Sequence, residues 1–421
     1  MSFPFTAKSL RHPFSRVAAI AWVAVGMSTE CSAQAITQWD YKDLGSLGGT
    51  FVGPVAAAAN GVAIGQAFTA KGGTSGFVYR DGSITGIGSL GGSASAAFYV
   101  NAAGQVAGQS YTAGDASNRA FLYSGGKMSD IGTLGGTGSY TAGLNASGQV
   151  VGYSDTRGNV STHAFLYGGN KLTDLGTLGG SYSAASGIND AGHVVGNAYT
   201  VGDASSHAFL YSVGKMRDLG TLGGATSFAV AVNNSGVVIG DSYTTGDAAS
   251  HAFVYSSGAM SDIGTFGGSQ STAVAINKNG QVIGNANTEG DAASHAFLYG
   301  AGKLIDLGTL GGTNSSVVGI NSHGQVIGTS EVAGSKIRRS FLYSDGIMQD
   351  LSSLFPGLSN FVATGINDAG QIVGSAITKT GFMRGLIVSA VPETDGWLMA
   401  ATGFAALCLL SRYRRREARD A

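Results

Sequence analysis

Four histidines recur at a fixed spacing in this 421-residue chain and are the first residues whose chemistry could serve a function. Each stands before Ala-Phe, at His163, His207, His251 and His295. A ring of imidazoles could bind a metal ion, but ligands must converge within about 2 Å of the ion. Copies of one repeat hold equivalent side chains far apart unless these point at a common axis. We therefore expect each histidine to form a hydrogen bond within its own repeat, and we predict no metal site.

A second set consists of aspartates in the string Gly-Asp-Ala, at Asp115, Asp203, Asp247 and Asp291. Oxygen-rich loops can hold calcium. One carboxylate per loop is too few for that role, however, and Asn159 replaces one copy. An aspartate after glycine is typical of a tight turn, so we interpret this set as turn residues.

A third set is aromatic, with one member three residues after a recurring glycine, at Phe68, Tyr111, Tyr199 and Tyr243. Aromatic side chains at the base of a loop can stack on sugar rings while a tyrosine hydroxyl bonds ligand or water. Packing within the loop or the core explains the same pattern. The two interpretations stay open at this point, and all three sets together form the candidate ligand face.

No catalytic constellation accompanies these sets. The chain lacks Gly-x-Ser-x-Gly, His-Glu-x-x-His and phosphate-loop strings, and its two cysteines, Cys31 and Cys408, lie near the ends. Between residues 36 and 394 it has 16 basic and 21 acidic residues, a net charge of −5 that argues against nucleic acid. We predict a non-enzymatic binding or structural protein without a cofactor. The alternative is a carbohydrate-active lyase or hydrolase.

The residues just described belong to a repeat of 44 residues. Its markers are Asp-Leu-Gly-Thr-Leu-Gly-Gly, Ala-Phe-Leu-Tyr and Ile-Asn-x-x-Gly-Gln-Val-Val-Gly, and each occurs eight times when worn copies are counted. The asparagines of the third marker are Asn60, Asn101, Asn145, Asn189, Asn233, Asn277, Asn321 and Asn367. One copy, Lys336 to Arg339, is basic where others read Ala-Ser-His. It could meet an acidic polysaccharide, although a drifted, solvated loop is the simpler interpretation.

Each copy predicts four short strands. In the sixth copy these are residues 272–277, 281–285, 296–299 and 304–308, separated by Asn-x-x-Gly and Gly-rich turns. A fixed period of four strands predicts an all-β, eight-bladed β-propeller. The last copy stops before its fourth strand, and residues 36–45 supply only a fourth strand, so the two ends should complete one blade and leave no open edge. The alternative is a β-solenoid with capped ends.

The two ends of the chain are predicted to be targeting signals. Residues 1–35 have a basic start, an apolar run of eleven residues and Ala33-Gln34-Ala35, which together indicate a secretory signal peptide. Residues 390–421 contain Val391, Pro392 and Glu393, then an apolar stretch, then an arginine cluster. Positive charge after an apolar stretch holds that end in the cytoplasm. An ordinary C-terminal membrane anchor is the alternative for this tail.

Residues 36–389 resemble the HAF family of bacterial extracellular repeats, on the strength of His-Ala-Phe and the recurring strings. The tail, with Val391, Pro392 and Glu393, resembles the PEP-CTERM sorting signal, although Thr394 stands where that family usually has a second proline. These resemblances imply secretion to the cell surface or exopolysaccharide matrix of a Gram-negative bacterium. They also imply transient anchoring in the inner membrane and processing by an exosortase-type enzyme.

Overall fold

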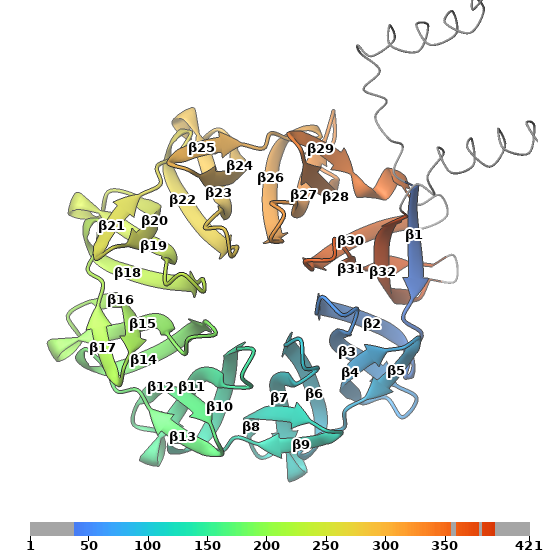
Figure 1. The fold of residues 1–421 in the computed structure, drawn as a ribbon, viewed down its shortest axis with the longest axis horizontal. Coiled ribbons are helices and arrows are strands. Elements are labelled where there is room, and N and C mark those ends of the chain that lie inside the picture. Colours follow the sequence, from blue (N-terminus) through green and yellow to red (C-terminus); the bar gives the residue numbers. More distant parts are fainter. Residues whose placement is uncertain (1–37, 355–358, 379–380, 392–421) are drawn as a thin grey trace, which may run out of the picture. The chain divides into compact units, whose positions relative to one another are not determined.

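The computed structural model describes residues 38–354, 359–378 and 381–391, and these form an all-β structure. Its strands fall into eight units of four, which we number 1 to 8 along the chain. Residues Trp39–Val391 form one compact body. Figure 1 shows the units side by side around one axis, with the first strand of each unit innermost.

The first strands are β2 (Gly48–Ala57), β6 (Gly91–Val100), β10 (Gly135–Leu144), β14 (Gly179–Ile188), β18 (Gly223–Val232), β22 (Gly267–Ile276), β26 (Gly311–Ile320) and β30 (Ser359–Ile366). The second strands are β3 (Ala63–Thr69), β7 (Val106–Thr112), β11 (Val150–Thr156), β15 (Val194–Thr200), β19 (Val238–Thr244), β23 (Val282–Thr288), β27 (Val326–Val332) and β31 (Ile372–Ile377).

The third strands are β4 (Thr74–Arg80), β8 (Asn118–Ser124), β12 (Thr162–Gly168), β16 (Ser206–Ser212), β20 (Ser250–Ser256), β24 (Ser294–Gly300), β28 (Arg338–Ser344) and β32 (Met383–Val391). The fourth strands are β5 (Ser83–Gly86), β9 (Lys127–Asp130), β13 (Lys171–Asp174), β17 (Lys215–Asp218), β21 (Ala259–Asp262), β25 (Lys303–Asp306), β29 (Ile347–Asp350) and β1 (Gln38–Asp43). Neighbouring strands are antiparallel within units 1 to 7 and among β30, β31 and β32, as unit 3 and unit 8 illustrate.

The first strand is longer than the sequence predicted, because the Gly-Gly pair belongs to it. In unit 6 the strand begins at Gly267 rather than at Thr272. The first glycine of the pair has a φ of +94° here, which favours glycine. At the second, Gly268, an added Cβ would lie 2.6 Å from the Cβ of Asn287 on β23. The pair therefore permits a left-handed step and then a close approach between strands, and is not a simple turn.

Asparagines at the turn after each first strand link one unit to the next. The side-chain amide of Asn145 donates to the backbone oxygen of Asn189 at 3.1 Å, and Asn367 donates to Ala58 at 2.8 Å, across 309 residues of sequence. The predicted marker Asn60 is wrong by two residues, because Ala58 occupies the position in unit 1 that the linking asparagines occupy in the other units. Asn60 instead donates to the oxygen of Ala102 at 3.1 Å, which restores a link to unit 2.

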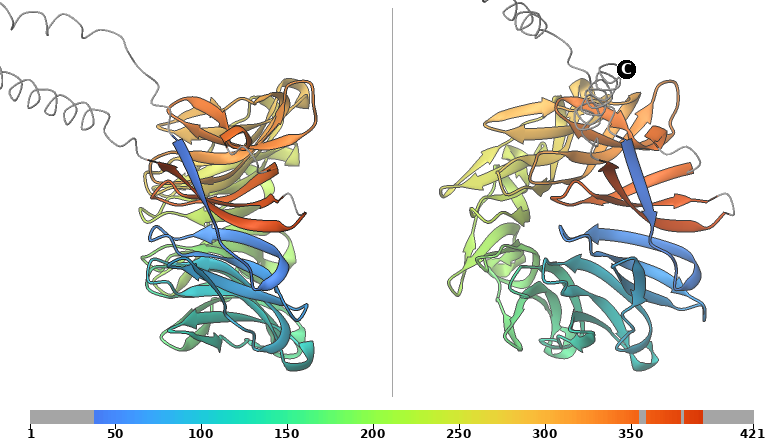
Figure 2. Two further views of the ribbon diagram at one scale, coloured as in Figure 1. Left: turned by 90° about the vertical axis from the view of Figure 1, so that its right-hand side faces the viewer. Right: turned by 45° about the vertical axis from the view of Figure 1, so that its right-hand side comes forward.

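The strand from the start of the chain lies beside the unfinished last unit, as expected. β1 pairs with β32, and the N–H of Leu44 donates to the oxygen of Gly385 at 2.9 Å. Leu175 makes the same bond to Ala164 in unit 3 at 2.9 Å, so β1 has the register of any other fourth strand. The two views of Figure 2 agree in placing β1 next to β32.

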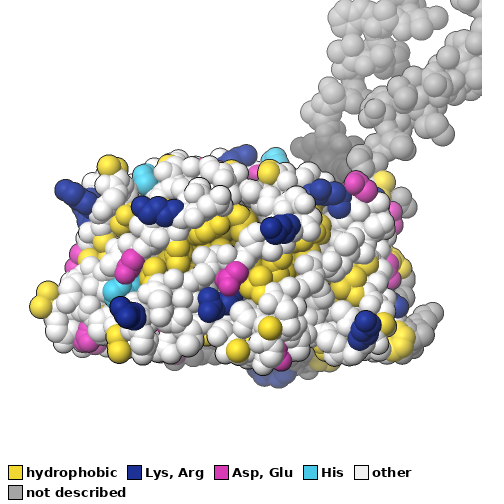
Figure 3. All heavy atoms as spheres, turned by 90° about the horizontal axis from the view of Figure 1, so that it is seen from below, with side chains coloured by type: hydrophobic (Ala, Val, Ile, Leu, Met, Phe, Trp, Pro, Cys, Tyr) yellow, Lys and Arg dark blue, Asp and Glu magenta, His cyan; other side chains and the backbone are white. Residues whose placement is uncertain are grey.

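The core is divided among the contacts between units. Each of the first seven units buries one phenylalanine of its third strand completely, at Phe77, Phe121, Phe165, Phe209, Phe253, Phe297 and Phe341. Seen from its outer rim, the body shows apolar strips between ridges, with charged side chains scattered singly (Figure 3). Most fourth strands on this rim have four residues, and several begin with lysine, which protects an edge from pairing with another chain.

Candidate functional site

The loops between the second and third strands and the connections between units lie on one face. In unit 3, Leu134 of the connection forms an isolated bridge with Thr156 at the end of β11, and the corresponding bridges occur in units 1 to 7. In units 2 to 6 the loop contains a short 3₁₀ turn, at Ala113–Asp115, Arg157–Asn159, Val201–Asp203, Thr245–Asp247 and Glu289–Asp291. We call this the loop face.

The predicted aspartates are turn residues in the structure. Asp115, Asp203, Asp247 and Asp291 have φ values of 55° to 58° and follow a glycine that is also left-handed. A carboxylate oxygen of each accepts the backbone N–H that follows the Gly-Gly pair, at 2.7 Å, for example from Ser93 to Asp115. That bond lowers the pKa of Asp115, and the corresponding bond from Ser269 lowers the pKa of Asp291.

The predicted histidines each bind a carboxylate within their own unit. His163, His207, His251 and His295 contact an aspartate of the fourth strand through Nδ1 at 2.7 to 2.9 Å. The second oxygen of that aspartate accepts the N–H of the following turn, as from Gly264 to Asp262 at 2.7 Å. The expected bond within the repeat is therefore present, and it joins the third strand, the fourth strand and the connection to the next unit.

The predicted aromatic side chains are exposed on the candidate face, as the predicted aspartates are. Phe68, Tyr111, Tyr199 and Tyr243 are 43%, 40%, 37% and 39% exposed. The Phe68 ring lies 5.1 Å from that of Phe51, and the Tyr199 ring 5.1 Å from that of Tyr182. Each pair joins the first and second strands of one unit, and Phe68 and Tyr199 remain more than a third exposed beside their partner rings.

The structure does not bring the three predicted sets together into one cluster. Each unit uses its own histidine and aspartate for its own loop. In the part of the chain that the structure describes, no group of three or more His, Cys, Asp or Glu side chains could hold a metal ion.

Sequence reasoning missed the partners of the histidines, Asp174, Asp218, Asp262 and Asp306. Their signal was available, because each aspartate follows its histidine by 11 residues and begins the Asp-Leu-Gly or Asp-Ile-Gly string. It also missed a stacked pair in unit 3, Tyr140 and Tyr153, whose ring centroids are 5.0 Å apart. Burial, with a smaller effect of Tyr140, raises the pKa of Tyr153.

A half-buried carboxyl in unit 5, Asp241, was not predicted either. It accepts the N–H of Ala273 in unit 6 at 2.7 Å, and it stands where unit 3 has Tyr153 and unit 6 has Asn285. Burial raises the pKa of Asp241 to about 6 despite that hydrogen bond. The group links two units and lies apart from the three predicted sets.

Comparison with solved structures finds similarities at low sequence identity. The chain is similar to the β-propeller domain of the Trilobed protease from Pyrococcus furiosus, at 8% identity and a TM-score of 0.41 over 69% of this chain and 94% of that one. It is also similar to dipeptidyl peptidase 4 of Porphyromonas gingivalis, at 10% identity and a TM-score of 0.47 over 76% of this chain and 54% of that one. TolB from Acinetobacter baumannii matches at 13% identity and a TM-score of 0.31, over 58% of this chain and 64% of that one.

No family model matches the chain, and no curated protein matches it. The predicted signal peptide and most of the predicted sorting tail, including Pro392 and Glu393, lie outside the described residues. Within the described residues, no helix is both long and apolar enough to span a bilayer.

Proposed function

We propose that this chain is an exported, non-enzymatic binding module of the cell surface or exopolysaccharide matrix, and that its loop face holds glycan. The scaffold is a closed eight-bladed β-propeller. Two contacts support closure: β1 pairs with β32 in the register of the other fourth strands, and Asn367 bonds to Ala58.

One observation carries the binding proposal. Of the three predicted sets, the exposed aspartates and the histidines use their polar groups for hydrogen bonds within their own units, whereas the aromatic set offers rings that are 37% to 43% exposed. An exposed aromatic ring offers a platform for the apolar face of a sugar. Repetition of that platform in units 1, 2, 4 and 5 suits a polymer of repeated sugars, because several weak contacts add to one useful affinity.

The location proposed from both ends of the sequence, the cell surface or the exopolysaccharide matrix, agrees with a polysaccharide ligand. A signal peptide at residues 1–35 would export the chain. A PEP-CTERM-like tail at residues 390–421 would anchor it in the inner membrane until an exosortase-type enzyme acts on it. These segments support the location on sequence grounds alone.

Binding of the full-length chain to the exopolysaccharide of its host tests the function. We expect binding by the unaltered protein and a loss of at least tenfold in affinity for the double variant Tyr111→Ala, Tyr243→Ala. Val201→Ser is the matched control, because Val201 is a 77% exposed side chain in the same type of loop but carries no ring. Absence of binding to the host polysaccharide, or equal binding by all three proteins, would refute the proposal.

A further inference from the structure

Unit 7 departs from the others on the loop face. Arg338 and Arg339 stand where unit 5 has Ser250 and His251. Arg339 takes over the role of the histidine, since its Nη1 donates to Asp350 at 2.8 Å. Its charge is therefore compensated within the unit, just as the histidines contact their aspartates.

A second change in unit 7 introduces a carboxylate and a lysine that form an ion pair with each other. Glu331 occupies the position of Tyr243 and is only 5% exposed. Its carboxylate accepts the N–H of Thr313 at 3.2 Å and a side-chain bond from Asn314 at 3.2 Å. Lys336 lies 3.4 Å from the same carboxylate, so this lysine and this glutamate balance each other.

Arg338 differs from its neighbours Arg339 and Lys336, because no carboxylate of a described residue forms an ion pair with it. Its side chain is exposed and its Nη1 donates to Ser316 Oγ at 3.4 Å. Among the described residues no carboxylate lies within 4.0 Å of its guanidinium nitrogens. Several of its five N–H donors are thus available to a ligand.

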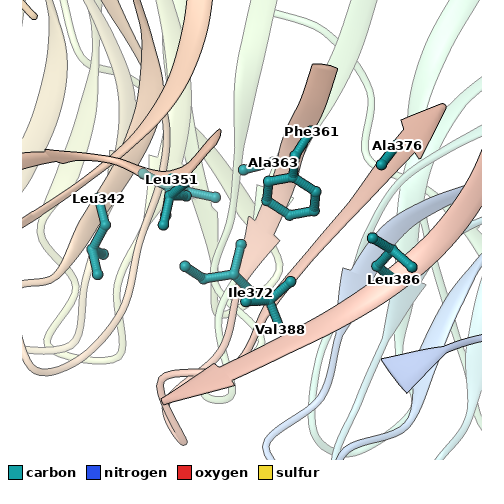
Figure 4. Close-up of a cluster of buried hydrophobic side chains, with 9 residues drawn as sticks. Leu342, Leu351, Phe361, Ala363, Ile372, Ala376, Leu386 and Val388 are labelled. Atoms are coloured by element: carbon teal, nitrogen blue, oxygen red, sulfur yellow. The ribbon is translucent and has the colours of Figure 1, made fainter. Parts of the chain in front are cut away.

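Arg338 lines a pocket of about 420 Å³ between the third strand of unit 7 and the first strand of unit 8. The polar part of its wall includes Thr329, Ser352 and Asn360, and the apolar part includes Phe361. Phe361 belongs to the buried cluster between these units and lies near Ala363 and Ile372 (Figure 4). The pocket therefore combines hydroxyl and amide side chains with Arg338, which forms no ion pair with a described residue, while Phe361 is only 2% exposed and belongs to the core.

We propose that this pocket is an anion subsite, and that it takes the carboxylate of a uronic acid residue in an acidic polysaccharide. A guanidinium matches a carboxylate through two parallel N–H···O bonds. Hydroxyl and amide side chains of Thr329, Ser352 and Asn360 can bond the sugar hydroxyls. A volume of about 420 Å³ is in the range of small-ligand pockets. This inference rests on the proposed function and adds the class of sugar.

The experiment measures affinity of the full-length chain for a hexagalacturonate, for its methyl ester and for a sulfated oligosaccharide, by calorimetry at low and physiological salt. We expect the methyl ester to bind at least tenfold more weakly, because esterification removes the charge. We expect Arg338→Gln to weaken hexagalacturonate about tenfold and leave the ester unchanged, and Arg338→Lys to restore part of the loss.

Arg157→Gln is the matched control, since Arg157 is exposed in the equivalent loop of unit 3. It should leave hexagalacturonate affinity unchanged, and the melting temperature of each variant shows that it is folded. A second measurement is protection of Arg338 from phenylglyoxal by hexagalacturonate, followed by mass spectrometry.

The outcomes separate this inference from the proposed function. If Arg338→Gln binds all three ligands as the unaltered chain does, the subsite is refuted while loss of binding in the Tyr111, Tyr243 variant still supports the loop face. If the sulfated oligosaccharide binds more tightly than hexagalacturonate and depends on Arg338, the carboxylate assignment is overturned. If the unaltered chain binds no polysaccharide, both proposals fail.

Discussion

The contacts between units 1 to 7 differ from the two contacts that flank unit 8. In each of the first six, a buried serine of one first strand accepts an N–H from the third strand of the preceding unit, at 2.8 to 3.0 Å. These serines are Ser95, Ser139, Ser183, Ser227, Ser271 and Ser315. Phe361 and Val52 occupy this position on the two sides of unit 8, and both are buried.

In both kinds of contact a phenylalanine ring fills the space over a glycine of the second strand, but the ring comes from different strands. In unit 5 the third-strand ring of Phe253 lies over Gly240, where an added Cβ would be 2.8 Å from the ring. In unit 8 the third strand has Leu386 instead, and Phe361 of the first strand lies over Gly374, with its ring 2.7 Å from an added Cβ. The hydroxyl has moved as well, since Ser340 now accepts the N–H of Ala363 at 2.9 Å.

This difference teaches how the composite unit is held. A serine that accepts one N–H contributes a directional contact of modest strength. Burial of a phenylalanine contributes more and demands less exact alignment. Unit 8 is assembled from both ends of the chain, and its two flanking contacts rely on apolar burial at the positions where the repeats use serine.

The largest effect should come from Phe361→Ala, which empties the space over Gly374. We expect a loss of about 3–5 kcal/mol in the free energy of unfolding, measured by denaturant titration. Phe253→Ala should cost a similar amount if the two rings are equivalent. A loss below about 1 kcal/mol for Phe361→Ala would show that unit 8 does not depend on this ring.

The next largest effect concerns the carboxyl between units 5 and 6. The pKa of Asp241 is raised to about 6 from 3.8, so its ionised form destabilises the fold above pH 6, and this cost is relieved as the pH falls from 6 toward 4. Asp241→Asn should raise stability at pH 7 by about 2–3 kcal/mol and flatten the dependence between pH 4 and 7.

Thermal melting of Asp241→Asn across that pH range gives the measurement. Asn285 shows that an amide fits the position, because it accepts the N–H of Val317 at 3.0 Å in the next contact. Unchanged stability at pH 7 would mean that the carboxylate is adequately solvated there.

A smaller effect should follow Ser227→Ala, which leaves the buried N–H of Ala208 without its acceptor. We expect a loss of about 2 kcal/mol by denaturant titration. Ser256→Ala, at an exposed position of β20, is the control and should change stability by less than about 0.5 kcal/mol. Equal effects of the two substitutions would remove the distinction between serine-linked and apolar contacts.

The smallest effect lies on the outer rim, away from both kinds of contact. Val213 is 98% exposed and has a φ of 49°, which is unfavourable for a β-branched residue. Asp81 and Asp345 hold the same turn position at 52° and 53°. Val213→Asp should therefore stabilise the protein by about 1 kcal/mol in thermal melting, and a decrease would show that Val213 makes contacts of its own.

The sequence by itself determined the features that depend on neighbours along the chain. The 44-residue period, the four strands per copy, the turn role of Asp115 and its equivalents, and the missing fourth strand all follow from local turn chemistry and strand patterning. Strand ends were predicted less well, since the first strand of unit 6 was predicted to begin at Thr272 and begins at Gly267 instead.

Tertiary structure alone decided the contacts between residues that are distant in sequence. It showed that Ala58, and not Asn60, is equivalent to the linking asparagines, that Phe361 replaces a third-strand ring, and that Arg338 is left unbalanced beside a pocket. These depend on how one unit packs against the next. The sequence of a single repeat does not determine that packing, because its hydrophobic and turn pattern is compatible with several different neighbouring units.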